Sequence, residues 1–461
     1  MIEATEAPLR WIRCLIGNMS GNYVDIFDDE EPLAYIGKRH VWGGMKPFGL
    51  WPEDRRQHVY CVGKSGTGKT TLLRNLIIQD IERGNGVGIV DPHGDLAEEL
   101  LDSIPPWRTD DVVYFNPADL DYPVGLNLLQ NVAPERRHRI ASGVVGAFKS
   151  IWRDSWGNRM EYILYAAVAA LLDCQNTSIL GIQRMLVDRR YRRWVVKQVK
   201  DPIVRSFWTR EFENYHPQFM QEAIAPIQNK VGQLLMSPPV RNVLGQVKRK
   251  VDPRFVMDNR RILIANLSKG LLGEDKANLL GSLLVTSFEL AALQRADMPE
   301  DERQDFHLYI DEFHNFTTDS FATILSEARK YRLCLTLSHQ YLDQLRDSVR
   351  HAVFGNAGTI ICFRVGGKDA KIMSEEFGGA YPVRAFTGLG RFEVLAQGRS
   401  GQSFAGQTLS PLRIRFGRLE TVMRRSREKY ASRKETVDGK IKRWDTAKHS
   451  RRIGERPNDL P

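Results

Sequence analysis

The sequence is poor in cysteine and has no long apolar run. Its five cysteines are scattered through 461 residues, with no CxxC pair and no His–Cys cluster. This spacing gives no support to a disulfide framework or a zinc site, and it is typical of reduced cytosolic thiols. No segment approaches the roughly 18–20 apolar residues of a membrane-spanning helix, and the best candidates, 162–172 and 277–288, predict buried helices. The start, Met1–Glu6, is acidic and lacks the order of a signal peptide, so we expect a soluble chain in the cytoplasm.

Positive charge is in excess, and most of the excess lies at one end of the chain. The formal net charge is +10. Residues 421–461 contain thirteen Lys and Arg against six Asp and Glu, a balance of +7. A basic tail suits an anionic partner such as a nucleic acid, but a solvated tail without a partner has the same composition. Both interpretations stay open at this point.

Apolar segments that end in polar turns alternate with helical patterns, which is typical of a parallel sheet with crossover helices. The expected strands are 58–62, 86–90, 111–115, 261–267, 306–310, 333–337 and 359–364. Between 134 and 252 the strand signals vanish and apolar residues recur at helical spacing. We therefore expect an α/β fold with a mostly parallel, twisted sheet and an all-helical insertion domain.

A glycine-rich loop follows the expected strand at 58–62 and precedes a helix expected at 71–83. It matches GxxxxGK[ST] in full, in the strand–loop–helix setting that a P-loop requires. Glycines let backbone N–H groups surround phosphate oxygens, and the helix N-terminus adds partial positive charge. Lys69 is expected to reach the β- and γ-phosphates of ATP, and the Thr70 hydroxyl to bind Mg²⁺. The expected nucleotide-binding residues are Gly63, Lys64, Ser65, Gly66, Thr67, Gly68, Lys69, Thr70 and Thr71.

Two acids directly follow the expected strand at 306–310. They supply the carboxylates that a P-loop ATPase needs beside its phosphate-binding loop. Asp311 is expected to hold Mg²⁺ through water, and Glu312 to polarise the water that attacks the γ-phosphate. Simple nucleotide switches usually lack the second acid, whereas hydrolysing motors have it. A solvated strand end is the alternative interpretation.

Two further residues are candidates for sensing nucleotide. Gln340 follows the strand at 333–337 and is expected to contact the γ-phosphate. Arg329 closes the helix expected at 321–331 and is a candidate arginine finger for the site of a neighbouring subunit. A cation that complements the C-terminal end of its helix is the alternative for Arg329.

Polar groups after the strand at 86–90 are expected near the nucleotide, because parallel strands end on the ligand side of a sheet. Asp91 and Asp95 are candidates for metal or water contacts, with turn and N-cap roles as the alternative. His93 has no cysteine or histidine partner nearby, so a metal-ligand role is disfavoured. The basic stretches 191–194 and 248–250 and the C-terminal tail are candidate DNA contacts or solvated helix faces.

Taken together, these motifs resemble the HerA–FtsK class of additional-strand, RecA-like P-loop ATPases. The segments that carry the resemblance are 61–71, 90–96, 266–270, 308–316, 325–331, 338–340 and 355–356. Their order and the helical insertion resemble TraD-type coupling proteins, which bring DNA to a conjugative type IV secretion channel. The resemblance covers roughly residues 48–407.

The expected domains follow from this organisation. They are a β-rich N-terminal segment at 1–50, an ATPase domain in two parts at 51–133 and 253–410, the all-α insertion at 134–252, and a basic tail at 411–461. A loop is expected at 51–56. For the last forty residues we expect disorder or a loosely held helix.

The resemblance implies a homo-hexameric ring around DNA, single- or double-stranded and without sequence preference, driven by ATP and Mg²⁺. It assigns the roles described above to Lys69, Thr70, Asp311, Glu312, Gln340 and Arg329. It also implies relaxase and secretion-channel partners. Coupling proteins commonly begin with transmembrane helices and this sequence has none, so a truncated form, a member docked at the inner face of the membrane through a partner, and a soluble motor with another task stay open.

The hypothesis is an ATP-driven DNA translocase. Three alternatives remain: an ATPase that energises protein secretion or channel assembly, a nucleotide-gated adaptor that recruits substrates, and a HerA-like DNA-processing helicase. The Asp311–Glu312 pair together with Gln340 favours a hydrolysing motor over the adaptor.

Overall fold

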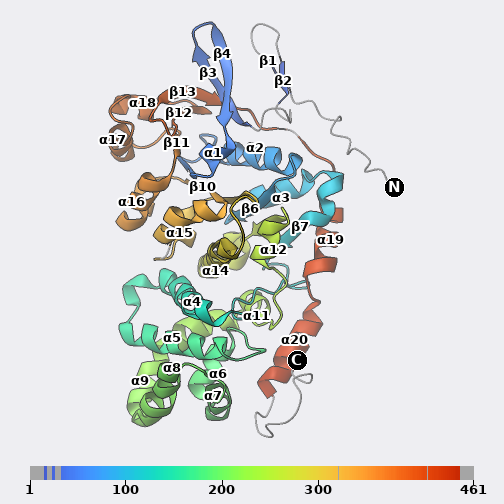
Figure 1. The fold of residues 1–461 in the computed structure, drawn as a ribbon, viewed down its shortest axis with the longest axis vertical. Helices are drawn as coiled ribbons and strands as arrows, with labels where there is room; N and C mark the ends of the chain where they lie inside the picture. The colour runs from blue at the N-terminus through green and yellow to red at the C-terminus, as the bar shows by residue number, and fades with distance from the viewer. Residues whose placement is uncertain (1–14, 18–22, 26–32, 320, 413, 447–461) are drawn as a thin grey trace.

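The computed structural model describes residues 15–17, 23–25, 33–319, 321–412 and 414–446. An 11-stranded sheet occupies one half of the molecule, and a helical domain occupies the other half (Figure 1). In spatial order the strands are β4 (Gly44–Leu50), β3 (Ala34–Val41), β13 (Ser403–Thr408), β12 (Glu393–Gln397), β11 (Thr359–Cys362), β5 (Val59–Val62), β10 (Leu333–His339), β9 (Phe306–Ile310), β6 (Gly86–Asp91), β8 (Ile262–Asn266) and β7 (Val112–Phe115).

The sheet has a parallel part and an antiparallel part. From β11 through to β7 every neighbouring pair is parallel, as the alternation of strands and helices in the sequence predicts. From β11 outward, β12, β13, β3 and β4 pair antiparallel. The sequence patterns did not indicate β12 and β13. β13 is mostly half-buried or exposed, and β12 buries only Val394, Leu395 and Ala396.

Helices cover both faces of the sheet. They are α1 (Pro52–Arg55), α2 (Lys69–Glu82), α3 (Asp95–Asp102), α12 (Pro253–Asp258), α13 (Lys269–Leu272), α14 (Glu274–Gln294), α15 (Phe321–Glu327), α16 (Asp347–Asn356), α17 (Gly367–Glu376) and α18 (Val383–Thr387). Successive strand residues point to opposite faces, so Val59 and Cys61 join the core beneath α2 and α3. Tyr60 and Val62 join the core on the α14 side.

The insertion between β7 and β8 is helical throughout 134–252. Its helices are α4 (Arg137–Ile151), α5 (Asn158–Leu172), α6 (Gly181–Val187), α7 (Arg189–Val196), α8 (Pro202–Ser206), α9 (Pro217–Ile227), α10 (Gln233–Met236) and α11 (Pro238–Leu244). A π-helical turn at Gln228–Gly232 joins α9 to α10. The apolar core of the insertion is continuous with the α14 face of the sheet.

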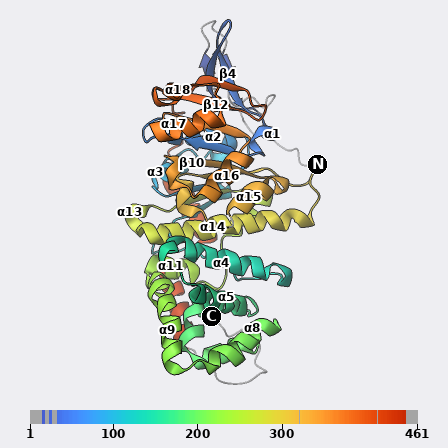
Figure 2. The ribbon, with the colours of Figure 1, turned by 90° about the vertical axis from the view of Figure 1, so that its left-hand side faces the viewer.

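Helix α14 lies between the sheet and the insertion, and both layers pack on it (Figure 2). Together with its C-terminal turn, 274–297, it is the one helix among the described residues that is long and apolar enough to cross a membrane. Its most apolar 18-residue window is 72% buried inside the protein. Burial on two sides explains its composition, because a helix enclosed by two layers is apolar all round.

The C-terminal segment differs from the sequence expectation. In place of disorder or a loosely held helix, it forms α19 (Leu419–Tyr430) and α20 (Lys434–Thr446), which run along one side of the molecule from the sheet to the insertion (Figure 1). Val422 and Val437 are buried against these layers. The patterns missed them because each helix buries only a narrow stripe and exposes basic residues elsewhere. Residues 447–461 lie outside the described part of the chain.

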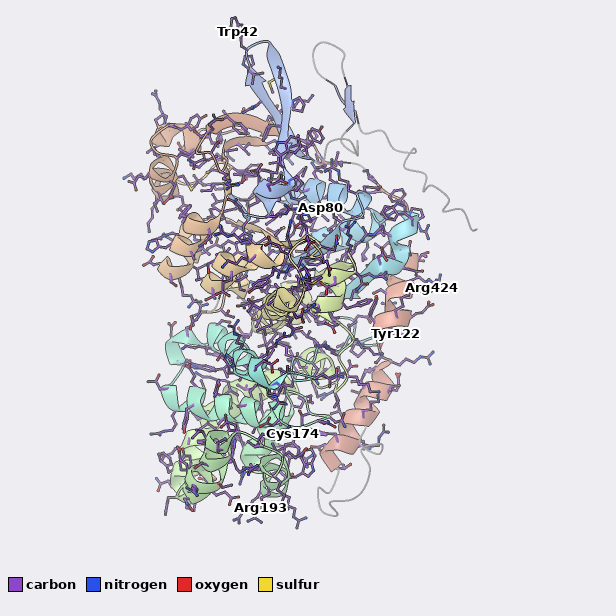
Figure 3. The ribbon with its side chains drawn as sticks, in the orientation of Figure 1. Trp42, Asp80, Tyr122, Cys174, Arg193 and Arg424 are labelled. Atoms are coloured by element: carbon purple, nitrogen blue, oxygen red, sulfur yellow. The ribbon has the colours of Figure 1, made fainter. Side chains whose placement is uncertain are left out.

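The N-terminal segment forms a projecting hairpin of β3 and β4, with Trp42 fully exposed at its tip (Figure 3). The short strands β1 (Leu15–Gly17) and β2 (Tyr23–Asp25) pair with each other, and the rest of residues 1–32 lies outside the described part of the chain. The loop expected at 51–56 is instead the helical turn α1. Its Arg55 is buried and bonds to Asp80 of α2 and Tyr309 of β9, which ties the hairpin connection to the ATPase core.

Candidate nucleotide-binding and hydrolysis site

The P-loop connects β5 to α2 and packs closely against the antiparallel part of the sheet. Gly68 has a φ of 121°, and a Cβ there would lie 2.7 Å from the Phe392 ring. A Cβ at Gly63 would lie 2.5 Å from that of Phe363. The Phe392 N–H also donates to the Thr67 carbonyl at 2.8 Å. Glycine is therefore required by tertiary contacts as well as by phosphate approach, and the sequence did not indicate this supporting role of the two phenylalanines.

Lys69 is the first residue of α2, two positions earlier than the helix start that the sequence predicts. Its ammonium donates to the carbonyls of Gly63 at 2.5 Å and Lys64 at 3.2 Å. Burial lowers the pKa of this ammonium, an effect that the neighbouring Glu312 and Asp311 oppose. A cavity of about 460 Å³ at the first turns of α2 is lined by Thr70, Thr71, Arg74, Glu99, Pro411 and Arg415.

Two candidate residues, Glu312 and Gln340, meet at the carboxyl ends of the neighbouring strands β9 and β10. Strand β10 lies between β5 and β9, so Gln340 follows the strand beside both the P-loop strand and the acidic pair. Gln340 Nε2 donates to Glu312 Oε1 at 2.9 Å. Glu312 has a φ of 46°, in the left-handed region where a non-glycine residue costs about 1–3 kcal/mol. Strain of this kind clusters at functional sites, and here it aims the carboxylate of Glu312 at Gln340.

Asp311 is 5% exposed and faces other acids. Burial first, and then the charges of Glu312 and Asp91, raise its pKa to about 6. A cation in this position would relieve the repulsion, because an opposite charge favours the ionised carboxylate. The arrangement therefore fits a divalent metal held near Asp311.

Residues that the sequence analysis did not single out complete the surroundings of Glu312. Asn315 Nδ2 donates to the Glu312 carbonyl at 2.8 Å, and Lys269 Nζ donates to Asn315 Oδ1 at 2.7 Å. His314 Nδ1 lies 3.5 Å from Glu312 Oε2, and burial together with Lys269 lowers the pKa of His314 to about 4. His314 is therefore neutral at physiological pH and forms no ion pair with Glu312.

The residues after β6 take structural positions. Asp91 accepts hydrogen bonds from the backbone N–H groups of His93 at 2.9 Å and Ala97 at 3.0 Å, so both its oxygens serve the turn and the start of α3. Asp95 is exposed in the first turn of α3. Across the described residues, no group of His, Cys, Asp and Glu has a metal-binding arrangement of its own, His93 included.

Arg329 lies away from the other candidates. It is exposed in the 3-10 turn Ala328–Tyr331, just before the amino end of β10, whereas Gln340 follows the carboxyl end of that strand. The seven residues of β10 separate the two by roughly 23 Å, at about 3.3 Å per residue. Arg329 therefore has no contact with the P-loop of its own subunit.

The basic stretches differ in environment. Within 191–194, Tyr191 and Arg192 are buried, and Arg193 lies at the outer end of the insertion (Figure 3), 3.7 Å from Glu213. This stretch is a packed helix. Lys248 and Lys250 instead line a cavity that the C-terminal helix also lines.

The fold and site define a P-loop nucleotide-binding protein of the additional-strand, RecA-like class. The family model for the DNA-binding domain of type IV secretion-system coupling proteins matches residues 44–223. The model for the TraM recognition site of TraD and TraG matches residues 305–392. The chain therefore belongs to the TraD-type coupling proteins of type IV secretion.

Solved structures share the fold. The unbound bacterial conjugative coupling protein TrwBdeltaN70 aligns with 16% identity and a TM-score of 0.59, over 82% of this chain and 90% of its own. TrwB in complex with the ATP analogue ADPNP gives 16% and 0.60 over the same shares. VirB4 of Thermoanaerobacter pseudethanolicus gives 13% and 0.56, over 83% and 97%. No curated protein sequence matches the chain.

Proposed function

We propose that the protein is an ATP-driven DNA translocase that serves as the coupling ATPase of a conjugative type IV secretion system. The observation that carries this proposal is the contact between Gln340 and Glu312 beside the P-loop, in a chain with the coupling-protein DNA-binding domain. A motor needs a catalytic carboxylate whose position depends on the bound nucleotide. The hydrogen bond would link Glu312 to Gln340, the residue expected to contact the γ-phosphate.

ATP and Mg²⁺ fit the residues present. The backbone N–H groups of 63–71, Lys69 and the N-terminus of α2 would hold the phosphates. Thr70 and, through water, Asp311 would hold Mg²⁺, which neutralises charge on the phosphate oxygens. The raised pKa of Asp311 is consistent with this assignment, because burial first and then the charges of Glu312 and Asp91 disfavour the ionised carboxylate, and a bound cation would offset that cost.

Glu312 would orient and polarise the attacking water. One of its oxygens accepts from Gln340, and the second N–H of the Gln340 amide would bond a γ-phosphate oxygen. Loss of the γ-phosphate frees that N–H. Glu312 and the strand end that carries Gln340 would therefore change position together during each turnover.

A cluster that we call the seam connects this site to the insertion. It consists of Thr317 and Asp319, after the acidic pair, with Lys149 of α4, Arg153 in the 3-10 turn just after α4, and Arg346 before α16. Arg153 Nη2 donates to the Thr317 carbonyl at 2.7 Å, and Lys149 Nζ lies 3.6 Å from Asp319 Oδ2. Arg346 also pairs with Asp319. A cavity of about 860 Å³ between the insertion and the sheet side has Lys149 and Asp319 in its lining, so polar contacts join the layers here and leave room for movement.

The position of Arg329 supports a ring. Since it cannot reach the nucleotide of its own subunit, a catalytic role requires the site of a neighbour, as in a homo-hexamer around DNA. The alternative, a helix-end cation, requires no neighbour. Complementation between subunits separates the two.

We place the protein in the cytoplasm, at the inner face of the membrane through a partner, with relaxase and secretion-channel proteins as further partners. The tip of the β3–β4 hairpin, at the end opposite the insertion, is exposed and offers a surface to such a partner (Figure 3). Release of the protein from a membrane fraction on deletion of residues 41–45, with the ATPase fold intact, tests this placement.

The test of the proposed function is steady-state ATP hydrolysis, with and without single- and double-stranded DNA, across a salt series. A translocase shows strong stimulation by DNA that fades with salt, because the contacts are to backbone phosphates. Turnover indifferent to DNA contradicts the proposal and favours the secretion ATPase. Negligible turnover in every condition favours the adaptor.

A further inference from the structure

Two basic stretches that are nearly 190 residues apart in the sequence meet in the structure. Lys248 and Lys250 follow α11, and Lys440 lies on α20. All three line one cavity of about 290 Å³ in the crevice between the insertion and the C-terminal helix. This cavity, which we call the lysine pocket, is formed by elements other than those of the P-loop.

The charge of the lysine pocket is uncompensated. No Asp or Glu is among its lining residues. Among the described residues, no ion pair involves any of the three lysines. By contrast, the intervening Arg249 pairs with Asp252 at 2.6 Å. Three like charges around one cavity repel each other, and an anion in the cavity removes that cost.

The walls of the pocket are held in place by hydrogen bonds. On one side, the Lys250 N–H donates to the Gly125 carbonyl at 2.9 Å, and Asn127 Nδ2 donates to the Val247 carbonyl at 2.6 Å. On the other side, the Ser432 N–H donates to the Pro123 carbonyl at 3.1 Å. Arg184 donates to the carbonyl of Trp444 at 2.6 Å and stacks on its ring. The backbone that carries the lysines is therefore held in place on both sides of the pocket.

Apolar and hydroxyl groups accompany the lysines. Trp444 and Ile441 supply apolar surface, and Ser432 and Thr436 supply hydroxyls. Aromatic surface next to cations is the combination that accommodates a nucleobase together with its phosphate. The volume is close to the lower limit for small-ligand sites, which suits a single nucleotide.

We propose that the lysine pocket is a second binding site for a nucleoside phosphate, separate from the P-loop. The three lysines bind the phosphate, the hydroxyls bind phosphate or sugar oxygens, and the apolar wall takes the base. The nucleoside phosphate is either a free nucleotide or one nucleotide of a DNA strand, and the strand source rests on the proposed function. The pocket lies mostly outside residues 44–223, the span of the DNA-binding family match.

The test uses full-length protein with Lys69→Ala, which silences the P-loop. Binding of a fluorescent ATP analogue and of a fluorescein-labelled twelve-residue oligothymidylate is measured by anisotropy across a salt series. The test variant adds Lys248→Gln and Lys440→Gln. The matched control adds Lys434→Gln and Lys442→Gln, which remove equal charge from α20 outside the pocket lining.

We expect the test variant, and not the control, to lose at least tenfold in affinity. A loss confined to the oligonucleotide identifies a DNA strand, with the salt slope reduced by about 1.4 for two phosphate contacts at about 0.7 each. A loss for the ATP analogue identifies a free nucleotide. Equal affinities of test and control variants for both probes overturn the proposal. Because binding is read without turnover, this result is separate from failure of the translocase proposal, which shows as DNA-indifferent hydrolysis in protein with Lys69 intact.

Discussion

Replacing Asp311 with asparagine should make the protein more stable at neutral pH while it removes a metal-binding group. Asp311 is 5% exposed, and burial with the charges of Glu312 and Asp91 raises its pKa from 3.8 to about 6. The folded state therefore binds the proton more tightly than the unfolded chain. Stability of the wild-type protein falls as the pH rises from about 4 through about 6, and the loss is complete above that range.

The size of the effect follows from the shift. The two pKa values differ by about 2.2. At about 1.36 kcal/mol for each pKa unit, this difference corresponds to about 3 kcal/mol. Asparagine has nearly the same shape and carries no charge, so it avoids this cost. Unfolding entropy of about 2.1 cal/mol/K per residue gives about 1 kcal/mol/K for the whole chain, so the midpoint should rise by about 3 °C if the chain unfolds as one unit.

The assay is thermal unfolding of wild-type and Asp311→Asn protein at pH 4.5 and pH 8, without metal. The variant should gain stability at pH 8 and little at pH 4.5. Addition of Mg²⁺ with a non-hydrolysable ATP analogue should stabilise the wild-type protein more than the variant. Asp95→Asn, an exposed acid at the same sheet edge, is the matched control and should change little. A variant that is less stable than wild type at pH 8 would refute the reasoning.

Four further outcomes are expected. Lys69→Ala should abolish ATP turnover while circular dichroism shows that the fold is intact. Retained turnover would contradict the assignment of Lys69 to the nucleotide site. Glu312→Gln should lower turnover by about 10²–10⁴-fold, the usual contribution of a general base, with nucleotide binding preserved in fluorescence titrations; unchanged turnover would remove Glu312 from the chemistry. Arg329→Ala should be inactive alone but active in mixed rings with Lys69→Ala, and absence of complementation would return Arg329 to a helix-end role. Arg153→Gln should keep DNA-independent hydrolysis but lose DNA stimulation, since it breaks the contact between the turn after α4 and the loop after Glu312; stimulation equal to that of Arg139→Gln, an exposed control on α4, would show that the seam does not carry the effect of DNA to the hydrolysis site.

Local sequence determined the motifs and the type of most elements. The glycines and Lys69 mark the P-loop because only those residue types combine a tight turn, free backbone N–H groups and a cation. The acids after an apolar strand mark the metal side of the sheet because parallel strands end at one edge. Helical spacing marked the insertion, since each of its longer helices buries one face.

Tertiary structure alone decided how those parts meet. The order of the strands places β10 between β5 and β9, and so brings Gln340 to Glu312, although 28 residues separate them in the sequence. The same holds for Phe392 against the P-loop and for Lys440 opposite Lys248. The C-terminal helices were missed because their stability comes from packing on the sheet and the insertion, and periodicity within one segment carries no information about a distant surface. Sequence determined which groups the protein has, and long-range packing determined which of them share a site.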